Sequence, residues 1–112
     1  MLVVISPAKK LNMGQTNKYK TTKPIFTQEA NDLVNVVNKL SVDSFKNLMK
    51  LSPNLTQLNM ERFLKFGNQE KKASVLAFAG DTYQGLDAGR FSKEDFDWAQ
   101  DHLVILSGLY GI

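Results

Sequence analysis

The chain has 112 residues, of which 43% are hydrophobic and 22% charged, the composition of an ordinary globular domain with room for one core. It contains no cysteine, which excludes disulfides, thiolate metal sites and thiol-based redox sensing within these residues. Its apolar stretches are far shorter than the ~20 residues that span a bilayer, and its first residues lack the basic flank of a signal peptide. We therefore expect a cytoplasmic protein without a membrane partner.

Three short apolar runs predict buried strands, at residues 2–5, 74–79 and 103–106. Each is continuously apolar, as expected where both faces of a sheet are covered. The patterns between and after these runs are helical. The sequence therefore predicts a mixed α/β (α+β) fold, in which a short central sheet has helices between its strands.

Helical patterns fill most of the sequence between the first two predicted strands. Thr27 is placed to cap a helix that runs through Leu40, and Ser41 is placed to cap a second, short helix. Ser52 followed by Pro53 has the cap-then-proline order that opens a third helix. The second and third helices would form a hairpin over about residues 41–66.

The remaining elements are a loop and one more helix. Residues 10–23 show no periodicity, which predicts an extended loop. Ser92 and Asp95 have the spacing of a capping box, which predicts a helix through about Asp101. The sequence shows no internal repeat and no domain linker.

Charge is distributed unevenly along the chain, although the formal net charge is only +3. Lysines precede the first acidic residue, Glu29, at positions 9, 10, 18, 20 and 23, whereas acidic residues dominate after residue 73. Clustered lysines are typical of a surface that binds phosphate or nucleic acid. A solvated lysine-rich loop explains the same composition equally well.

Each predicted strand is followed by a loop rich in polar residues and glycine, at residues 6–10, 80–85 and 107–111. If the three strands are parallel neighbours, these loops lie at one edge of the sheet, where open α/β sheets bind ligands. Hydroxyls, lysines and glycine N–H groups suit an anionic ligand, above all a phosphate. The chain has no Walker or dinucleotide-binding motif.

One interpretation of these loops is an enzyme that acts on a phosphorylated or nucleotide substrate. The residues that would line its cleft are Lys9, Asp81, Tyr83, Ser107 and Tyr110. Lys9 would neutralise the charge of the substrate and Asp81 would act as the base. Asp81 is equally suited to fixing a turn by an Asx hydrogen bond, and the tyrosines to packing.

Other polar and aromatic residues near the end of the chain favour structural roles. His102, the only histidine, follows Asp101 at a helix end, where capping is favoured over iron binding. Phe96 and Trp98 are expected in the core. An acidic group on the same helix is expected to be a solvated face rather than a cation site: Glu94, Asp95, Asp97 and Asp101. We therefore predict neither a metal site nor a cofactor.

Four strings of residues carry a resemblance to a known family. They are ISPAKKL at residues 5–11, FAGDTYQGL at 78–86, FSKEDFDWAQ at 91–100 and LSGLYG at 106–111. In this order they closely resemble the YaaA family of bacterial peroxide stress proteins. One departure is Asn12, where members of the family often have an aspartate. Members continue well past the last string, so we expect this chain to be the incomplete N-terminal part of a larger single domain, with a strand edge that invites self-association.

The resemblance implies a cytoplasmic protein that helps cells to survive hydrogen peroxide by limiting free intracellular iron and oxidative damage. It also implies binding of double-stranded DNA through a helix-hairpin-helix element, on a mixed α/β fold with a positively charged cleft. Such an element contacts the phosphate backbone and does not read sequence.

The predicted hairpin at residues 41–66 is the candidate for that element. The residues assigned to DNA contact are Lys9, Lys10, Lys46, Lys50, Ser52 and Asn54. The turn lacks the glycines common in helix-hairpin-helix loops, so an ordinary hairpin that buries Phe45, Leu48 and Leu55 is an alternative.

Three functions therefore stay open at the level of sequence. The basic N-terminal half favours a non-enzymatic DNA-binding protein of the peroxide response, which is our leading hypothesis. The convergence of polar loops favours the enzyme. An iron-binding protein would have to use carboxylates, because the chain has a single histidine and no cysteine.

Overall fold

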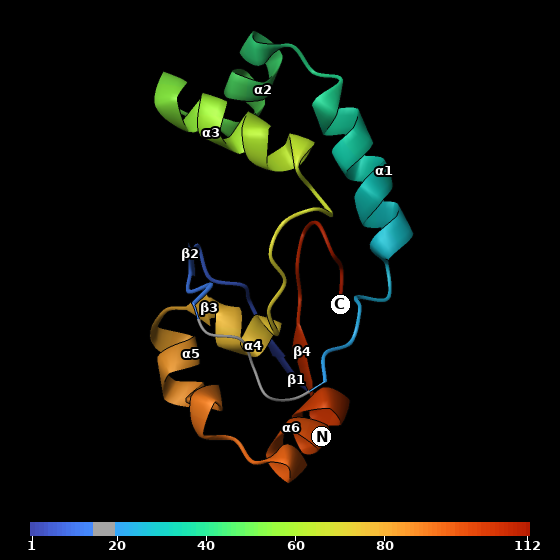
Figure 1. The fold of residues 1–112 in the computed structure, drawn as a ribbon, viewed down its shortest axis with the longest axis vertical. Helices are drawn as coiled ribbons and strands as arrows, with labels where there is room; N and C mark the ends of the chain where they lie inside the picture. The colour runs from blue at the N-terminus through green and yellow to red at the C-terminus, as the bar shows by residue number, and fades with distance from the viewer. Residues whose placement is uncertain (15–19) are drawn as a thin grey trace. The chain divides into compact units, whose positions relative to one another are not determined.

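The computed structural model describes residues 1–14 and 20–112, and the chain divides into two compact units. The first unit comprises Met1–Phe26 and Glu70–Ile112, and the second comprises Thr27–Gln69 (Figure 1). The mixed α/β class predicted from the sequence is confirmed: helices dominate, and the strands are short. Lys18, one of the basic residues before Glu29, lies outside the described residues.

The first and third apolar runs form strands that pair with each other. Strand β1 (Val3–Ile5) lies parallel to β4 (Leu103–Ile105), with Val4 opposite Val104 (Figure 1). The N–H of Leu106 donates to the carbonyl of Ile5 at 2.9 Å, which extends the ladder beyond β4. The two predicted strands are confirmed.

The second apolar run is a helix over most of its length, so the prediction of a strand over residues 74–79 is wrong there. Ser74–Ala77 forms the short helix α4, and only Phe78–Ala79 forms a strand, β3. The N–H groups of Leu76 and Ala77 both donate to the carbonyl of Ala73, which closes the turn. A run this short has the same apolar pattern in a buried helical turn as in a buried strand.

Strand β3 does not join the sheet of β1 and β4, so the prediction of three parallel neighbours is also wrong. It pairs antiparallel with β2 (Lys10–Leu11), in a register that sets Lys10 opposite Ala79. Strand β2 lies at the start of the predicted extended loop, and the N–H of Asn12 continues the contact by donating to the carbonyl of Ala77 at 2.7 Å.

The loop expected after the second run is a helix. Helix α5 (Asp81–Leu86) begins directly after Gly80 and is followed by the short 3-10 helix η1 (Ala88–Arg90). Between them Asp87 adopts the left-handed conformation, with φ of 51°.

Helix α6 (Lys93–His102) begins with the predicted capping box. The Asp95 N–H donates to Ser92 Oγ at 3.2 Å, and the Ser92 N–H donates to Asp95 Oδ2 at 2.9 Å. Trp98 on this helix is 55% exposed, so its expected place in the core is wrong. Helix α6 packs on a sheet of only two strands, which is too narrow to cover a side chain of this size.

The second unit consists of α1 (Thr27–Asn38), α2 (Val42–Met49) and α3 (Pro53–Leu64), in the order predicted. Ser41 and Ser52 are the N-caps of α2 and α3. Their side chains accept hydrogen bonds from backbone N–H groups in the first turn of each helix, which satisfies donors that the helix itself leaves unpaired.

Helix α3 packs against both α1 and α2, and the core of this unit lies among them. Phe45 is 1% exposed, and its ring meets that of Phe63 edge-on at 5.8 Å. Leu48 and Leu55 are 65% and 48% exposed, so the alternative hairpin that buries them together with Phe45 is wrong for both leucines. None of the helices in the described part of the chain is long and apolar enough to cross a membrane.

Candidate functional site

The first polar loop, at residues 6–10, contacts the second through the side chain of Tyr83. The hydroxyl of Tyr83 donates to the carbonyl of Ser6 at 2.5 Å, and the ring lies 5.4 Å from that of Phe78. Tyr83 is 6% exposed, and its burial raises the pKa of the hydroxyl, which therefore stays a protonated donor at neutral pH.

The backbone of the first loop lies directly against the start of α5. A Cβ built on Gly80 would be 3.5 Å from the Cβ of Ala8, an ordinary van der Waals distance. Lys10 is paired with Ala79, so Lys9 and Asp81 each lie within two residues of this pair in the sequence. Lys9 and Asp81 are both exposed, and neither forms an ion pair with another described residue.

The third loop, at residues 107–111, closes on itself. Ser107 and Gly111 exchange backbone hydrogen bonds of 2.7 and 3.0 Å, and Ser107 Oγ accepts from the N–H groups of Leu109 and Tyr110. Gly111 has φ of 74°, and a Cβ there would lie 2.7 Å from the ring of Phe26, so this position requires glycine. Tyr110 is 41% exposed, and partial burial raises its pKa.

These contacts separate the candidate catalytic residues into two kinds. The hydroxyls of Tyr83 and Ser107 are bonded to backbone groups and hold their loops in place. Lys9 and Asp81 keep exposed charges at the junction of the first two loops. The loops after β1 and β3 therefore meet, through the hydrogen bond from Tyr83 to Ser6 and the pairing of β2 with β3 rather than through the shared sheet edge that the sequence suggested.

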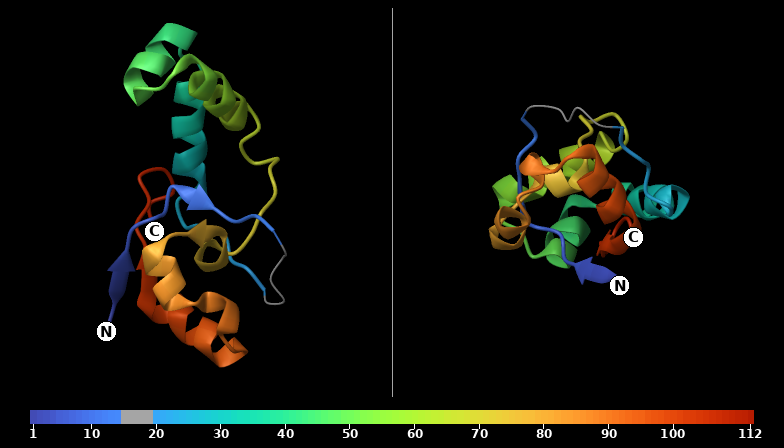
Figure 2. Two further views of the ribbon diagram at one scale, coloured as in Figure 1. Left: turned by 90° about the vertical axis from the view of Figure 1, so that its left-hand side faces the viewer. Right: turned by 90° about the horizontal axis from the view of Figure 1, so that it is seen from below.

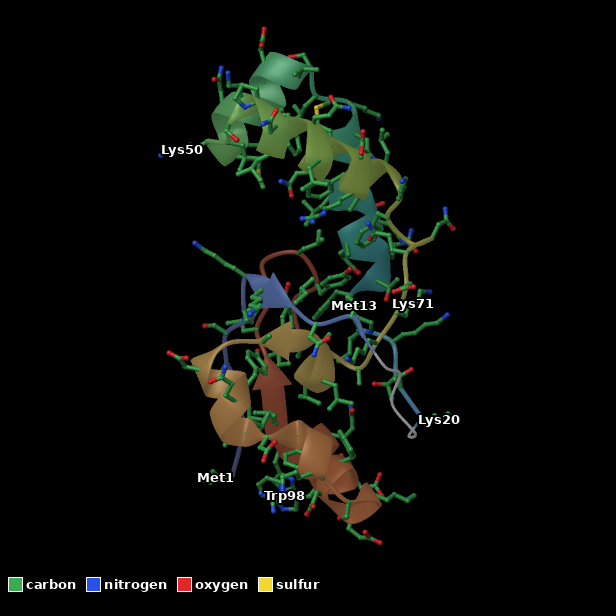
Figure 3. All side chains as sticks on the ribbon, turned by 60° about the vertical axis from the view of Figure 1, so that its left-hand side comes forward. Met1, Met13, Lys20, Lys50, Lys71 and Trp98 are labelled. Carbon is green, nitrogen blue, oxygen red and sulfur yellow. The ribbon has the colours of Figure 1, made fainter. Side chains whose placement is uncertain are left out.

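The turn between α2 and α3 carries the other group of candidates. Lys50 adopts the left-handed conformation, with φ of 53°, and the N–H groups of Lys50 and Leu51 both donate to the carbonyl of Lys46. The bond from Leu51 is the one that defines a Schellman turn, and the bond from Lys50 is that of the simpler αL motif. Both motifs usually take a glycine at this position. Lys50 thus adopts a backbone conformation that is typical of glycine. Its side chain extends away from the turn (Figure 3).

The start of α3 presents few free backbone donors. Pro53 has no N–H, and those of Leu55 and Thr56 donate to Ser52 Oγ at 3.3 Å and to the Ser52 carbonyl at 2.8 Å. No acceptor among the described residues forms a hydrogen bond with the N–H of Asn54. The helix dipole places partial positive charge at this end, so the N–H of Asn54 suits an anion.

The candidate DNA contacts therefore lie in two groups on different units. Lys46, Lys50, Ser52 and Asn54 surround the turn of the second unit, whereas Lys9 and Lys10 belong to the first unit. Lys50 and Asn54 are exposed and Lys46 is half-buried. No ion pair joins any of these lysines to another residue within 1–14 and 20–112.

His102 is the last residue of α6, and its side chain contacts the preceding turn of the same helix. Its Nδ1 donates to the carbonyl of Trp98 at 2.7 Å, and the two rings stack with centroids 4.1 Å apart. On the same helix Lys93 Nζ lies 2.7 Å from Asp97 Oδ2, a hydrogen bond that raises the pKa of Lys93. Among the described residues, no three acidic or histidine side chains gather as a metal ion would require.

A pocket of about 220 Å³ in the first unit was not anticipated. It is lined by Met13, Gly14 and residues 70–72. Lys72 Nζ donates to the carbonyl of Asn12 at 2.9 Å, and the side chain of Asn12 accepts from the N–H of Gly14. The signal for this pocket in the sequence was the adjacent pair Lys71 and Lys72. The hydrogen-bond partner of Lys72, Asn12, lies 60 positions earlier in the chain.

The order of these loops and their residues matches a known family along the whole chain. The model of the peroxide stress protein YaaA family matches residues 1–112. This chain belongs to the YaaA family. A UPF0246 protein of Ruegeria pomeroyi is 47% identical to it over 116 residues, and UPF0246 proteins of Bordetella petrii and Crocosphaera subtropica are 44% and 42% identical.

The matched region is only part of each relative. The alignments cover all of this chain but 45% of the Ruegeria pomeroyi protein, 46% of the Bordetella petrii protein and 45% of the Crocosphaera subtropica protein. The chain thus spans somewhat less than half the length of these curated relatives.

Proposed function

We propose that this chain is the DNA-contacting part of a protein of the peroxide stress response, which binds the phosphate backbone of double-stranded DNA without reading its sequence. Membership of a family of peroxide stress proteins supports the cellular role. The turn between α2 and α3 supports the binding role, because it holds two lysines beside the start of a helix.

The observation that carries the proposal is the left-handed conformation of Lys50. This conformation costs a non-glycine residue about 1 kcal/mol, and a glycine would adopt it freely. A lysine at such a position keeps its exposed ammonium group at the tip of the turn, where a glycine would provide none. Strain at an exposed turn is typical of a site retained for function.

The expected contact is a single phosphate held at the turn. Asn54 would donate its backbone N–H to a phosphate oxygen, at the positive end of the dipole of α3. Lys46 and Lys50 would supply the positive charge and release counterions from the DNA. Ser52 would hold the start of the helix in shape through its hydrogen bond to Leu55, and would not contact DNA itself.

In the cell, we infer that the protein acts in the cytoplasm, where it limits free iron and oxidative damage. The described residues provide protonatable and cationic groups for phosphate but no cluster of metal ligands. We therefore propose nucleic-acid contact, rather than iron binding, as the role of the described lysines.

The test is a fluorescence-anisotropy titration of a short duplex at several salt concentrations. Binding is expected to weaken steeply with salt and to be the same for unrelated sequences. In the Lys46→Ala, Lys50→Ala double variant, the slope of log K against log salt should fall by about 0.9 for each lysine. Lys93→Ala is the matched control, since it removes one lysine that is paired with Asp97.

Two results would remove the proposal. One is an unchanged slope in the double variant, which would show that the turn carries no phosphate contact. The other is an equal loss in the Lys93→Ala control, which would show that only net charge matters. Circular dichroism of each variant establishes that the helices are intact.

The enzyme is the second candidate, supported by the exposed charges of Lys9 and Asp81 at the junction of the first two loops. Calorimetric titration with nucleotides and sugar phosphates tests it directly. Lys9→Ala should abolish such binding, whereas Asp81→Asn should preserve binding and abolish turnover. Loss of DNA binding in Asp81→Asn would instead show that the junction and the DNA surface are one site.

A further inference from the structure

The two faces of the β1–β4 sheet differ in what covers them. Val3 and Leu103 are paired in the register, and both line an apolar pocket of about 350 Å³ together with Trp98 and Ala99 of α6. Helix α6 therefore lies over this face of the sheet.

The opposite face is apolar and open. Val4 is paired with Val104, and the two-residue period of a strand adds Leu2 and Leu106 to the same side. Leu2, Val4 and Leu106 are 62%, 54% and 57% exposed. Figure 2 shows β1 at the outside of the first unit, where it forms the free edge of the sheet. We call these four residues the open face.

A parallel sheet with an open apolar face is uncommon in folded proteins. Parallel strands occur almost only where both faces are covered, and their sequences are continuously apolar for that reason. A sheet of two strands is also narrower than the sheets of independently stable domains. Contiguous apolar residues on a surface of this kind mark a site of contact with another polypeptide.

We propose that the open face is a docking surface for the apolar side of a helix from the part of the YaaA family chain that lies outside the matched region. The curated relatives carry more than half of their length outside that region, so the family has the polypeptide to cover it. A helix is the expected form, because helices are the layers that cover parallel sheets. The open face has no charged residue, which matches an apolar helix side and excludes nucleic acid as its occupant.

Labelling of a single thiol tests the proposal, since this chain has no cysteine of its own. Val4→Cys is made in this chain and in a full-length chimera, in which the chain replaces the matching part of the Ruegeria pomeroyi relative and the cysteines of the remaining part are changed to serine. The thiol at position 4 should react quickly with a maleimide in this chain alone. In the chimera its rate should fall by a factor of about 100 or more, since a buried thiol reacts only through local opening.

Glu94→Cys is the matched control, because Glu94 is an exposed polar residue of the same unit. Its labelling rate should be the same in both proteins. Equal rates at position 4 in this chain and in the chimera would overturn the proposal. So would protection of position 4 in this chain alone that increases with protein concentration, because the occupant would then be a second copy of the chain.

The thermal stability of the chimera gives a second measurement that does not depend on labelling. Val4→Glu places a charge on the docking surface and should lower the Tm of the chimera by about 5 °C or more. The same substitution in this chain alone should shift the Tm by far less, because Val4 is already half exposed. A shift of equal size in both proteins would contradict docking at this face.

Discussion

Removal of the Tyr83 hydroxyl is the perturbation that most directly tests how the first two loops are joined. Tyr83→Phe keeps the ring against Phe78 and deletes the one hydrogen bond from this side chain to the first loop, which ends on the carbonyl of Ser6. The contact links residues 77 positions apart, so it depends on tertiary structure and not on local sequence.

The expected loss of stability is about 1 kcal/mol. A typical intramolecular hydrogen bond contributes a net free energy of about 0.5–1.5 kcal/mol to stability. Removing one partner adds a further penalty only where the other partner stays buried and unpaired. Ser6 is exposed, so water can reach its carbonyl after the substitution. With a urea m value of about 1–2 kcal/mol/M for a chain of this size, the midpoint should fall by roughly 0.5–1 M.

The assay is urea unfolding followed by tryptophan fluorescence. Trp98 is the only tryptophan of the chain and lies in the same unit as Tyr83, so its signal reports on that unit. Phe78→Leu is the matched control, because it removes the ring contact and leaves the hydroxyl bond in place.

The pH dependence of the stability distinguishes the hydrogen bond of the hydroxyl from the packing of the ring, because only the hydroxyl titrates. Burial raises the pKa of Tyr83 above the 10.0 of a free tyrosine, so the unfolded chain loses this proton first as the pH rises. The contribution of the hydroxyl is therefore fully present below pH 10 and is lost as the pH rises through the raised pKa of the folded state. The stability difference between wild type and Tyr83→Phe should shrink above pH 10, and it should not shrink for Phe78→Leu. Equal urea midpoints for wild type and Tyr83→Phe at pH 7 would refute the reasoning.

Other substitutions test the turns on which the candidate sites depend. Gly111→Ala should destabilise the chain by about 1–3 kcal/mol in urea unfolding, because its Cβ would meet the ring of Phe26 at 2.7 Å and its φ is 74°. Ser52→Ala should cost about 1 kcal/mol, measured as a lower urea midpoint by circular dichroism, because Leu55 loses its capping acceptor. Lys50→Gly should raise stability by about 1 kcal/mol by relieving the left-handed conformation, and should weaken binding in the anisotropy titration of duplex DNA.

The helix starts could be predicted from the sequence because capping is a local property. Ser41, Ser52 and Ser92 each cap the helix that their spacing indicated, since a hydroxyl needs only the next few N–H groups to do so. The strands β1 and β4 were also predicted from the sequence, although the residues that pair lie near opposite ends of the chain.

The second apolar run shows where such prediction stops. Residues 74–77 close a helical turn on Ala73, and the two residues that remain pair with Lys10 and Leu11 rather than with β1. Whether the run forms a helical turn or a strand, and which strand it pairs with, depends on the segments that pack against it. The apolar pattern of four to six residues does not identify those segments. The same limit hid the contact between Tyr83 and Ser6, which no motif or spacing encodes.

Asn12 stabilises a local turn through a hydrogen bond that an aspartate side chain could also accept. Its side-chain oxygen accepts from the N–H of Gly14 at 3.1 Å, and its own backbone is held by Ala77 and Lys72. An aspartate carboxylate accepts the same hydrogen bond, so the turn is equally compatible with either residue. An aspartate at this position would add a negative charge to a residue whose backbone carbonyl already accepts a hydrogen bond from the ammonium group of Lys72. The backbone of this region therefore needs no carboxylate to fold as it does.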